Sequence, residues 1–246
     1  NDVNYGGSIK SFAFLLNNRC CVFIDKVRGF LSELTNGQLQ ISKGMINGLS
    51  KEFSKKTIAE QKKAFSDLLL SPVLNTDFTG CRLNGANVQV AVCASSDTVM
   101  YFARKNKGHK GVEGTPVEDY QGILVHDHDK TFYNYGSEHQ ECFAHVLRYL
   151  KDSIENEPNL KWNKQMRQLL QEMIHCRNSL DHDNDLAPDI VAGYETRYLH
   201  ILGIAKEEYE YEPPSKYYID GYNLYIRLYK YKESHLLFLQ FERTSA

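Results

Sequence analysis

Two aspartates, Asp77 and Asp127, stand where predicted strands end, and paired carboxylates can hold metal ions. Residues 72–77 predict a first strand that Asp77 closes, and the apolar run 122–125 predicts a buried fourth strand followed by Asp127. If the strands are neighbours and end together, the carboxylates lie close, which is costly unless a cation separates them. Mg²⁺ binds one or two carboxylates plus phosphate oxygens, and two such ions can clamp a phosphodiester. Aspartate is also common at strand ends, so a structural role stays open.

The composition is that of a globular protein with a real core. The chain has 246 residues, of which 42% are hydrophobic and 24% charged, with a net charge of −2. The composition excludes a disordered tail and a collagen-like fibre. The net charge argues against a protein that coats nucleic acid indiscriminately but leaves a local basic surface open. Apolar runs such as residues 20–24 are too short to span a bilayer, and no export leader opens the chain. Six cysteines, two of them adjacent, suggest a reduced, cytoplasmic protein.

Residues 1–70 are predicted to form an N-terminal helical region. Apolar side chains recur at helical spacing, and Ser42 can cap a helix that starts after it. The region holds ten Lys and Arg against six Asp and Glu, and two of its helices resemble a helix-turn-helix. Lys43, Asn47 and Lys51 are its candidate DNA-binding residues. A helical hairpin with a solvated polar face explains the pattern equally well.

The character of the chain changes twice after residue 70. Within residues 71–150, the alternation of Val88, Val90 and Val92 predicts a strand, residues 98–103 predict another, and a mixed α/β sheet follows. Residues 151–246 return to helical periodicity. The basic loop after the third strand supplies four further candidate DNA contacts, with a solvated hairpin tip as the alternative: Arg104, Lys105, Lys107 and Lys110.

The sequence also bears on several other chemistries. The chain has no phosphate-binding G-x-x-x-x-G-K-[ST], no G-x-G-x-x-G, no H-E-x-x-H and no G-x-S-x-G. Cys142 and His145 have a spacing that can bind zinc, which His175 and Cys176 could complete, although a buried cysteine is usually a core residue. The aspartate-rich loop at 181–189 lacks the glycine and terminal glutamate of an EF-hand.

One segment resembles transposases of the insertion-sequence 66 family. It comprises GILVHDHDKTFY at residues 122–133, then ECFAH at 141–145 and Arg148, with Phe143 where the family usually has Trp or Asn. Weaker similarity extends over nearly the whole chain, including DGYNL at 220–224 and KESHLLFL at 232–239.

The resemblance implies a ribonuclease-H-like core with a D-D-E site that binds Mg²⁺ or Mn²⁺. Asp77 and Asp127 match the first two acids, although Phe78 replaces the glutamate usual beside the first. The third acid belongs to an N-N-x-x-E-R element; the Asn17–Asn18 pair of this chain is not followed by Glu-Arg, no such pair precedes Glu242-Arg243, and Glu242 is the nearest candidate. The resemblance also places a group of residues near the site: Cys142, His145 and Arg148.

The implied function is that of a DNA transposase, which cuts transposon ends and joins them to target DNA by phosphoryl transfer. The residues 151–246 would then be a helical insertion, and homo-oligomers are expected. Two alternatives stay open. One is an inactive remnant that only binds DNA or a partner, and the other is a ribonuclease-H-like nuclease with another substrate.

Overall fold

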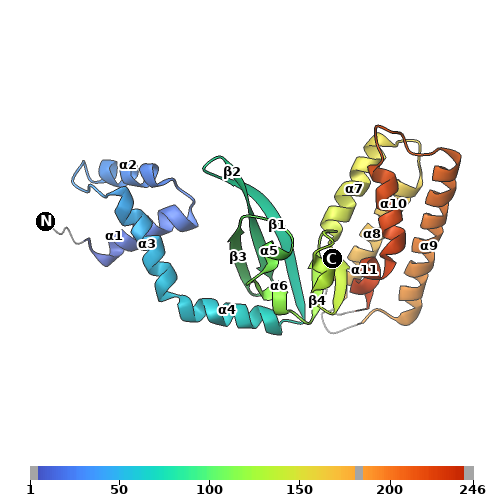
Figure 1. The fold of residues 1–246 in the computed structure, drawn as a ribbon, viewed down its shortest axis with the longest axis horizontal. Helices are drawn as coiled ribbons and strands as arrows, with labels where there is room; N and C mark the ends of the chain where they lie inside the picture. Colours follow the sequence, from blue (N-terminus) through green and yellow to red (C-terminus); the bar gives the residue numbers. More distant parts are fainter. Residues whose placement is uncertain (1–4, 181–184, 241–246) are drawn as a thin grey trace. The chain divides into compact units, whose positions relative to one another are not determined.

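The computed structural model describes residues 5–180 and 185–240, which fall into two compact units (Figure 1). The first unit is Asn1–Lys63 and the second is Ala64–Ala246. Helix α4 (Ile58–Leu70) contains the boundary between them. The sheet and the C-terminal helices therefore belong to the same unit.

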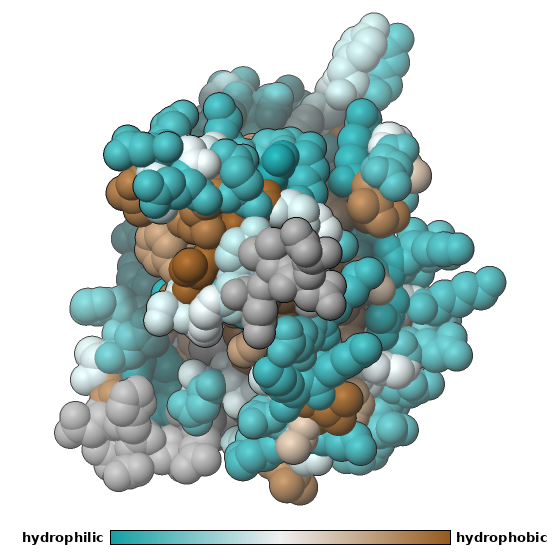
Figure 2. All heavy atoms as spheres, turned by 90° about the vertical axis from the view of Figure 1, so that its left-hand side faces the viewer, coloured by the Kyte–Doolittle hydropathy of each residue, from teal (hydrophilic) through white to brown (hydrophobic). Residues whose placement is uncertain are grey.

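The first unit is helical, as predicted. It contains α1 (Gly7–Phe14), the π-helical turn η1 (Leu15–Arg19), α2 (Ile24–Leu34) and α3 (Lys43–Lys56). The chain between α2 and α3 spans residues 35–42, longer than the three or four residues of a typical helix-turn-helix. Figure 2 shows brown apolar side chains interrupting a mostly hydrophilic surface. The buried core of this unit is small: Ala13, Val27, Leu31, Ile41 and Ile46.

Ser42 caps α3 as the sequence predicts. Its hydroxyl oxygen accepts a hydrogen bond of 3.1 Å from the backbone N–H of Met45. A Ser42→Ala substitution is expected to destabilise α3 by about 1 kcal/mol, because that N–H loses its partner. Hydrogen exchange of α3 amides should then accelerate about fivefold in the full chain. Ser11→Ala, at an exposed position inside α1, is the control. Unchanged exchange in α3 of the Ser42 variant would contradict the prediction.

The second unit contains a five-stranded mixed sheet, which confirms the predicted α/β class. Its strands are β1 (Val73–Leu83), β2 (Ala86–Ala94), β3 (Val99–Arg104), β4 (Ile123–His126) and β5 (Glu138–Glu141), in the order β3-β2-β1-β4-β5. The pairs β1–β2 and β2–β3 are antiparallel. The pairs β1–β4 and β4–β5 are parallel. The central strand β1 therefore has an antiparallel neighbour on one side and a parallel neighbour on the other.

Asp77 does not end the first strand, which corrects the prediction. Strand β1 continues past it to Leu83 and turns back into β2 through Asn84 and Gly85. Both turn residues have positive φ, 50° and 81°, as a two-residue hairpin requires. The Asn-Gly pair was the available sequence signal for this longer strand.

One face of the sheet is closely covered. The short helices α5 (His109–Val112) and α6 (Pro116–Asp119) and the turn η2 (Phe132–Asn134) contribute to a core with alternate residues of the strands. On β1, Leu74, Thr76 and Phe78 are buried, whereas Asn75 and Asp77 are only half-buried. Because side chains alternate between faces, Asp77 lies on the more open face.

The remaining helices pack around a second and larger core. They are α7 (Phe143–Asn156), α8 (Trp162–Asn178), α9 (Pro188–Tyr211), α10 (Asp220–Lys230), α11 (Lys232–Leu236) and the turn η3 (Leu237–Leu239). Trp162, Met166 and Leu170 are fully buried at its centre, as the helical periodicity predicts. Across the described residues, none of the helices combines the length and apolar character needed to cross a membrane.

Candidate functional site

The register of the parallel strands aligns Asp77 with Asp127. Asn75 on β1 is the partner of Val125 on β4. Strand β4 ends at His126, and Asp127 is the next residue, so the same register continued by two residues leads to Asp77 and Asp127. Both side chains are half-buried. The strand register is compatible with the two aspartates lying near each other, and their convergence stays a prediction.

Local hydrogen bonds orient both carboxylates. Asp77 Oδ1 accepts from the backbone N–H of Phe78 at 2.7 Å, and Asp127 Oδ1 accepts from the N–H of Asp129 at 3.0 Å. Asp129 Oδ1 in turn accepts from the N–H of Thr131 at 2.9 Å. These Asx-type turns fix the loop after β4. Among the described residues, neither Asp77 nor Asp127 has a cationic side chain as an ion-pair partner.

The described residues do not supply a third ligand to this pair. Between residues 5 and 180 and between 185 and 240, no three or more His, Cys, Asp or Glu side chains are grouped so that they could hold a metal ion. The zinc alternative built from Cys142, His145, His175 and Cys176 is therefore wrong for these residues. Glu242, the candidate third acid, lies outside the described residues, as does part of the aspartate-rich loop.

The residues predicted near the site have different surroundings. The Cys142 backbone N–H donates to the His126 carbonyl at 2.8 Å, so Cys142 continues β5 beside Asp127 and begins α7. His145 follows in the first turn of α7, and its Nδ1 is buried without a hydrogen-bond partner in the described structure. Arg148 is exposed and lies 5.8 Å from the ring of Tyr149. The structure therefore places Cys142 beside Asp127, whereas Arg148 points to solvent.

His126 points to the opposite face of the sheet from Asp127, as strand alternation predicts. It is 1% exposed and packs against Phe132, Tyr133 and His139, whose Nδ1 lies 3.2 Å from its Nε2. Burial lowers the pKa of His126 to about 4, and the neighbouring His139 adds to this effect. His126 is thus a neutral core residue near pH 7.

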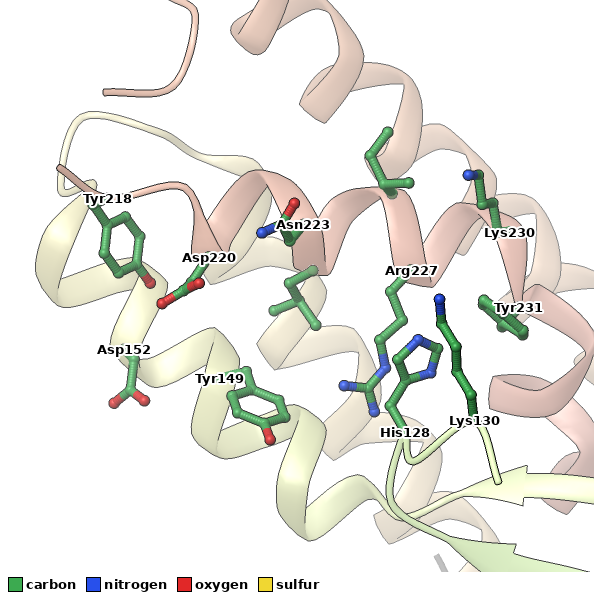
Figure 3. A pocket seen from close by; sticks show the side chains of 12 residues that line it. His128, Lys130, Tyr149, Asp152, Tyr218, Asp220, Asn223, Arg227, Lys230 and Tyr231 are labelled. Atoms are coloured by element: carbon green, nitrogen blue, oxygen red, sulfur yellow. The ribbon is translucent and has the colours of Figure 1, made fainter. Parts of the chain in front are cut away.

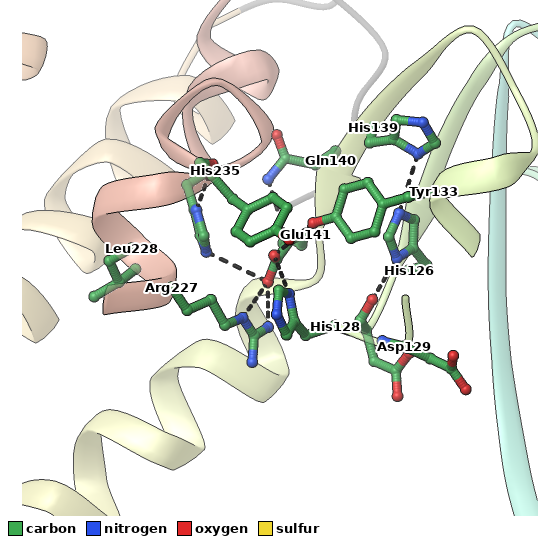
Figure 4. A network of polar contacts seen from close by, with 12 residues as sticks. His126, His128, Asp129, Tyr133, His139, Gln140, Glu141, Arg227, Leu228 and His235 are labelled. Carbon is green, nitrogen blue, oxygen red and sulfur yellow. Dashed lines mark hydrogen bonds and ion pairs between the residues drawn. The ribbon is translucent and has the colours of Figure 1, made fainter. Parts of the chain in front are cut away.

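Glu141 is the most strongly bonded buried charge in the second unit, and its role was not predicted. It ends β5, its side chain is fully buried, and it contacts three elements (Figure 4). Arg227 Nε donates to its Oε2 at 2.5 Å, and Arg227 Nη2 makes a further ion-pair contact. The Tyr133 hydroxyl donates to Oε1 at 2.6 Å, and His128 Nδ1 lies 2.7 Å from the same oxygen. His235 Nε2 lies 3.4 Å from Oε2.

These contacts determine the charge of Glu141. Burial alone would raise its pKa, but the hydrogen bond from His128, the nearby His235 side chain and the charge of Arg227 together hold the pKa well below its usual range. Burial and the adjacent carboxylate also raise the pKa of Tyr133. Glu141 therefore stays ionised and joins the loop after Asp127 to helices α10 and α11. The sequence gives little sign of this, because Arg227 is 86 residues away.

The predicted DNA-binding residues belong to two different units, and each group is described separately. Lys43, Asn47 and Lys51 are exposed along α3, and Lys43 forms an ion pair of 2.8 Å with Asp25. Arg104 is not free, because its guanidinium donates to the backbone carbonyls of Gly111 and Glu113. Arg104 therefore stabilises the basic loop through these hydrogen bonds, whereas it was predicted to contact DNA from that loop. The other three basic residues of that loop are exposed: Lys105, Lys107 and Lys110.

Comparison with known proteins identifies the class of this chain. Residues 27–210, more than half of the sequence, match a family of transposases. The match includes Asp77, Asp127 and Glu141. The chain belongs to the Transposase IS66 family, which confirms the resemblance of its 122–148 segment. No curated protein matches it.

Proposed function

We propose that the second unit is the ribonuclease-H-like core of a DNA transposase that cleaves and joins DNA strands by metal-assisted phosphoryl transfer. The observation that carries this proposal is the parallel register of β1 and β4, which pairs Asn75 with Val125, two residues before Asp77 and Asp127. Membership of the Transposase IS66 family supports it. So does the strand order, with β1 between an antiparallel hairpin partner and parallel β4.

Asp77 and Asp127 would hold Mg²⁺ or Mn²⁺. Their donor set fits these ions, because hard oxygen ligands from one or two carboxylates leave coordination positions for water and phosphate. Each aspartate commits Oδ1 to a backbone N–H, an arrangement that orients the carboxylate. The bound metal would polarise the phosphate and favour ionisation of the attacking oxygen. The third acid is proposed to lie elsewhere, with Glu242 as the candidate in this chain.

The DNA partners are proposed to be transposon ends and target DNA, bound by a homo-oligomer. Exposed cations on α3 and in the loop after β3 would contact phosphates. Lys51, Lys105, Lys107 and Lys110 are exposed candidates, and Lys43 would have to exchange its ion pair with Asp25 for a phosphate. Asn47 lies on the same side of α3 as Lys43 and Lys51, one turn from each.

Binding of Mn²⁺ by the full chain tests the proposal. Isothermal calorimetry should show binding that weakens at least about tenfold, or 1.4 kcal/mol, in both Asp77→Asn and Asp127→Asn. Each substitution keeps the side-chain shape and removes one negative ligand. Asp97→Asn, in the exposed turn between β2 and β3, is the matched control and should bind as the unchanged chain does. Binding that survives both site substitutions would reject the metal site and favour a DNA-binding protein without catalysis.

A further inference from the structure

A cavity of about 630 Å³ lies between α7, α10 and the loop that follows Asp127 (Figure 3). Its size is within the range of pockets that hold small ligands. The two helices run antiparallel. The start of α10 approaches the end of α7, since a Cβ on Gly221 would meet Glu157, and the other end of the pair is joined by Arg227 and Glu141. The cavity therefore has two chemically distinct ends.

The end nearer Asp127 is cationic. Lys130 from the loop and Lys230 from the end of α10 line it, beside His128 and Arg227. Glu141 neutralises Arg227, but among the described residues neither lysine has an acidic partner. Lys230 suits the C-terminus of a helix. Interaction with the helix dipole does not explain the position of Lys130, because Lys130 belongs to the loop after β4 and lines the same end of the cavity. Two uncompensated ammonium groups make this end a place for an anion.

The middle and the far end suit a nucleobase. Tyr149 is 39% exposed and lines the cavity between its two ends, and the Cζ of Arg227 lies 5.5 Å from the centroid of its ring (Figure 3). At the far end, Asp152 and Asp220 lie close enough to Tyr218 to help raise its pKa to about 12, after the larger effect of burial. Their carboxylates can accept hydrogen bonds from the N–H groups of a base, such as the ring N3–H of thymine, and an exposed aromatic ring is a stacking surface.

We infer that this cavity binds a nucleotide of single-stranded DNA, with its phosphate between Lys130 and Lys230 and its base against Tyr149. The inference rests on the proposed function, because the loop that carries Lys130 begins at Asp127. A strand leaving the metal site would then be held next to the place where it is cut. Duplex DNA does not fit such a site, because its bases are paired and stacked inside the helix.

Fluorescence anisotropy of a labelled oligothymidine tests the inference. Titrations of the full chain in EDTA exclude any contribution from a metal. The double variant Lys130→Ala/Lys230→Ala should weaken binding about tenfold or more and reduce the salt dependence by roughly 0.7 units of log–log slope, as expected for one neutralised phosphate of a single strand. Lys151→Ala/Lys206→Ala removes the same charge from exposed helix positions and is the matched control. Arg227 is left unchanged because it neutralises buried Glu141.

Substitutions of Tyr149 test base stacking separately from the charge of the two lysines. Tyr149→Ala should weaken oligothymidine binding about fivefold or more, whereas Tyr149→Phe should retain it, because the ring provides the contact. Equal losses in the pocket and control double variants would overturn the inference, and so would unchanged binding by Tyr149→Ala. Thymidine monophosphate that binds as tightly as the oligonucleotide would overturn the assignment to a DNA strand.

The result can be separated from that of the metal experiment. The pocket variants keep Asp77 and Asp127, so their Mn²⁺ binding should equal that of the unchanged chain. Normal Mn²⁺ binding with no effect of the pocket variants would reject this inference alone. Pocket-dependent binding of the oligonucleotide in a chain that does not bind Mn²⁺ would reject the metal site alone.

Discussion

An Arg227→Met variant should lose about 3–5 kcal/mol of the free energy of unfolding of the second unit. Glu141 is fully buried. Among the described side chains that contact it, Arg227 is the one that carries a permanent positive charge. Methionine keeps much of the arginine stem but leaves the carboxylate without that charge. The remaining contacts from Tyr133, His128 and His235 do not replace it, because a tyrosine is neutral and the histidines must first be protonated.

The chain offers a direct way to measure this loss. Its single tryptophan, Trp162, is buried in the core of the helices, so its fluorescence during urea unfolding reports on the unit that contains Glu141. Arg197→Met is the matched control, since Arg197 and Glu172 form a more exposed ion pair of 2.6 Å. That control should cost less than about 1 kcal/mol. Equal costs for both variants would show that the Glu141 contacts do not stabilise the fold.

Stability should also fall as the pH is lowered from 7 toward 4, because of His126. Burial lowers the pKa of this side chain in the folded protein to about 4, whereas the unfolded chain keeps a value near 6.5. Between these values the unfolded chain binds the extra proton, so acid favours unfolding. The two pKa values give a loss of about 2 kcal/mol at pH 5 and roughly 3 kcal/mol in total.

Urea unfolding at pH 7 and at pH 5 measures this effect. His126→Gln should reduce the difference in stability between the two pH values, because glutamine does not titrate. His139, whose pKa is also lowered by burial, contributes in the same direction and remains in the variant. The loss linked to Glu141 begins near the unfolded value of about 4.5 and continues at lower pH, so it is mostly separate. Equal pH dependence in both proteins would exclude His126 as the cause.

The local elements of this protein could be predicted from the sequence. Alternation at Val88, Val90 and Val92 defined β2, the apolar run before Asp127 defined β4, and Ser42 marked the start of α3. These signals are local because side chains two to four residues apart face the same side of one strand or helix. The Asn84–Gly85 turn is also a local signal, and it marks the end of β1 beyond the predicted end at Asp77.

The tertiary structure alone decided how those elements meet. The parallel register that leads to Asp77 and Asp127 depends on which residues are buried between strands, so a shift by one residue would place Asp77 on the other face. The pairing of Glu141 with Arg227 joins residues far apart in sequence, and no periodic pattern encodes such a contact. The cavity between α7 and α10 exists for the same reason, because its lysines come from a loop and a helix that only the folded chain brings together.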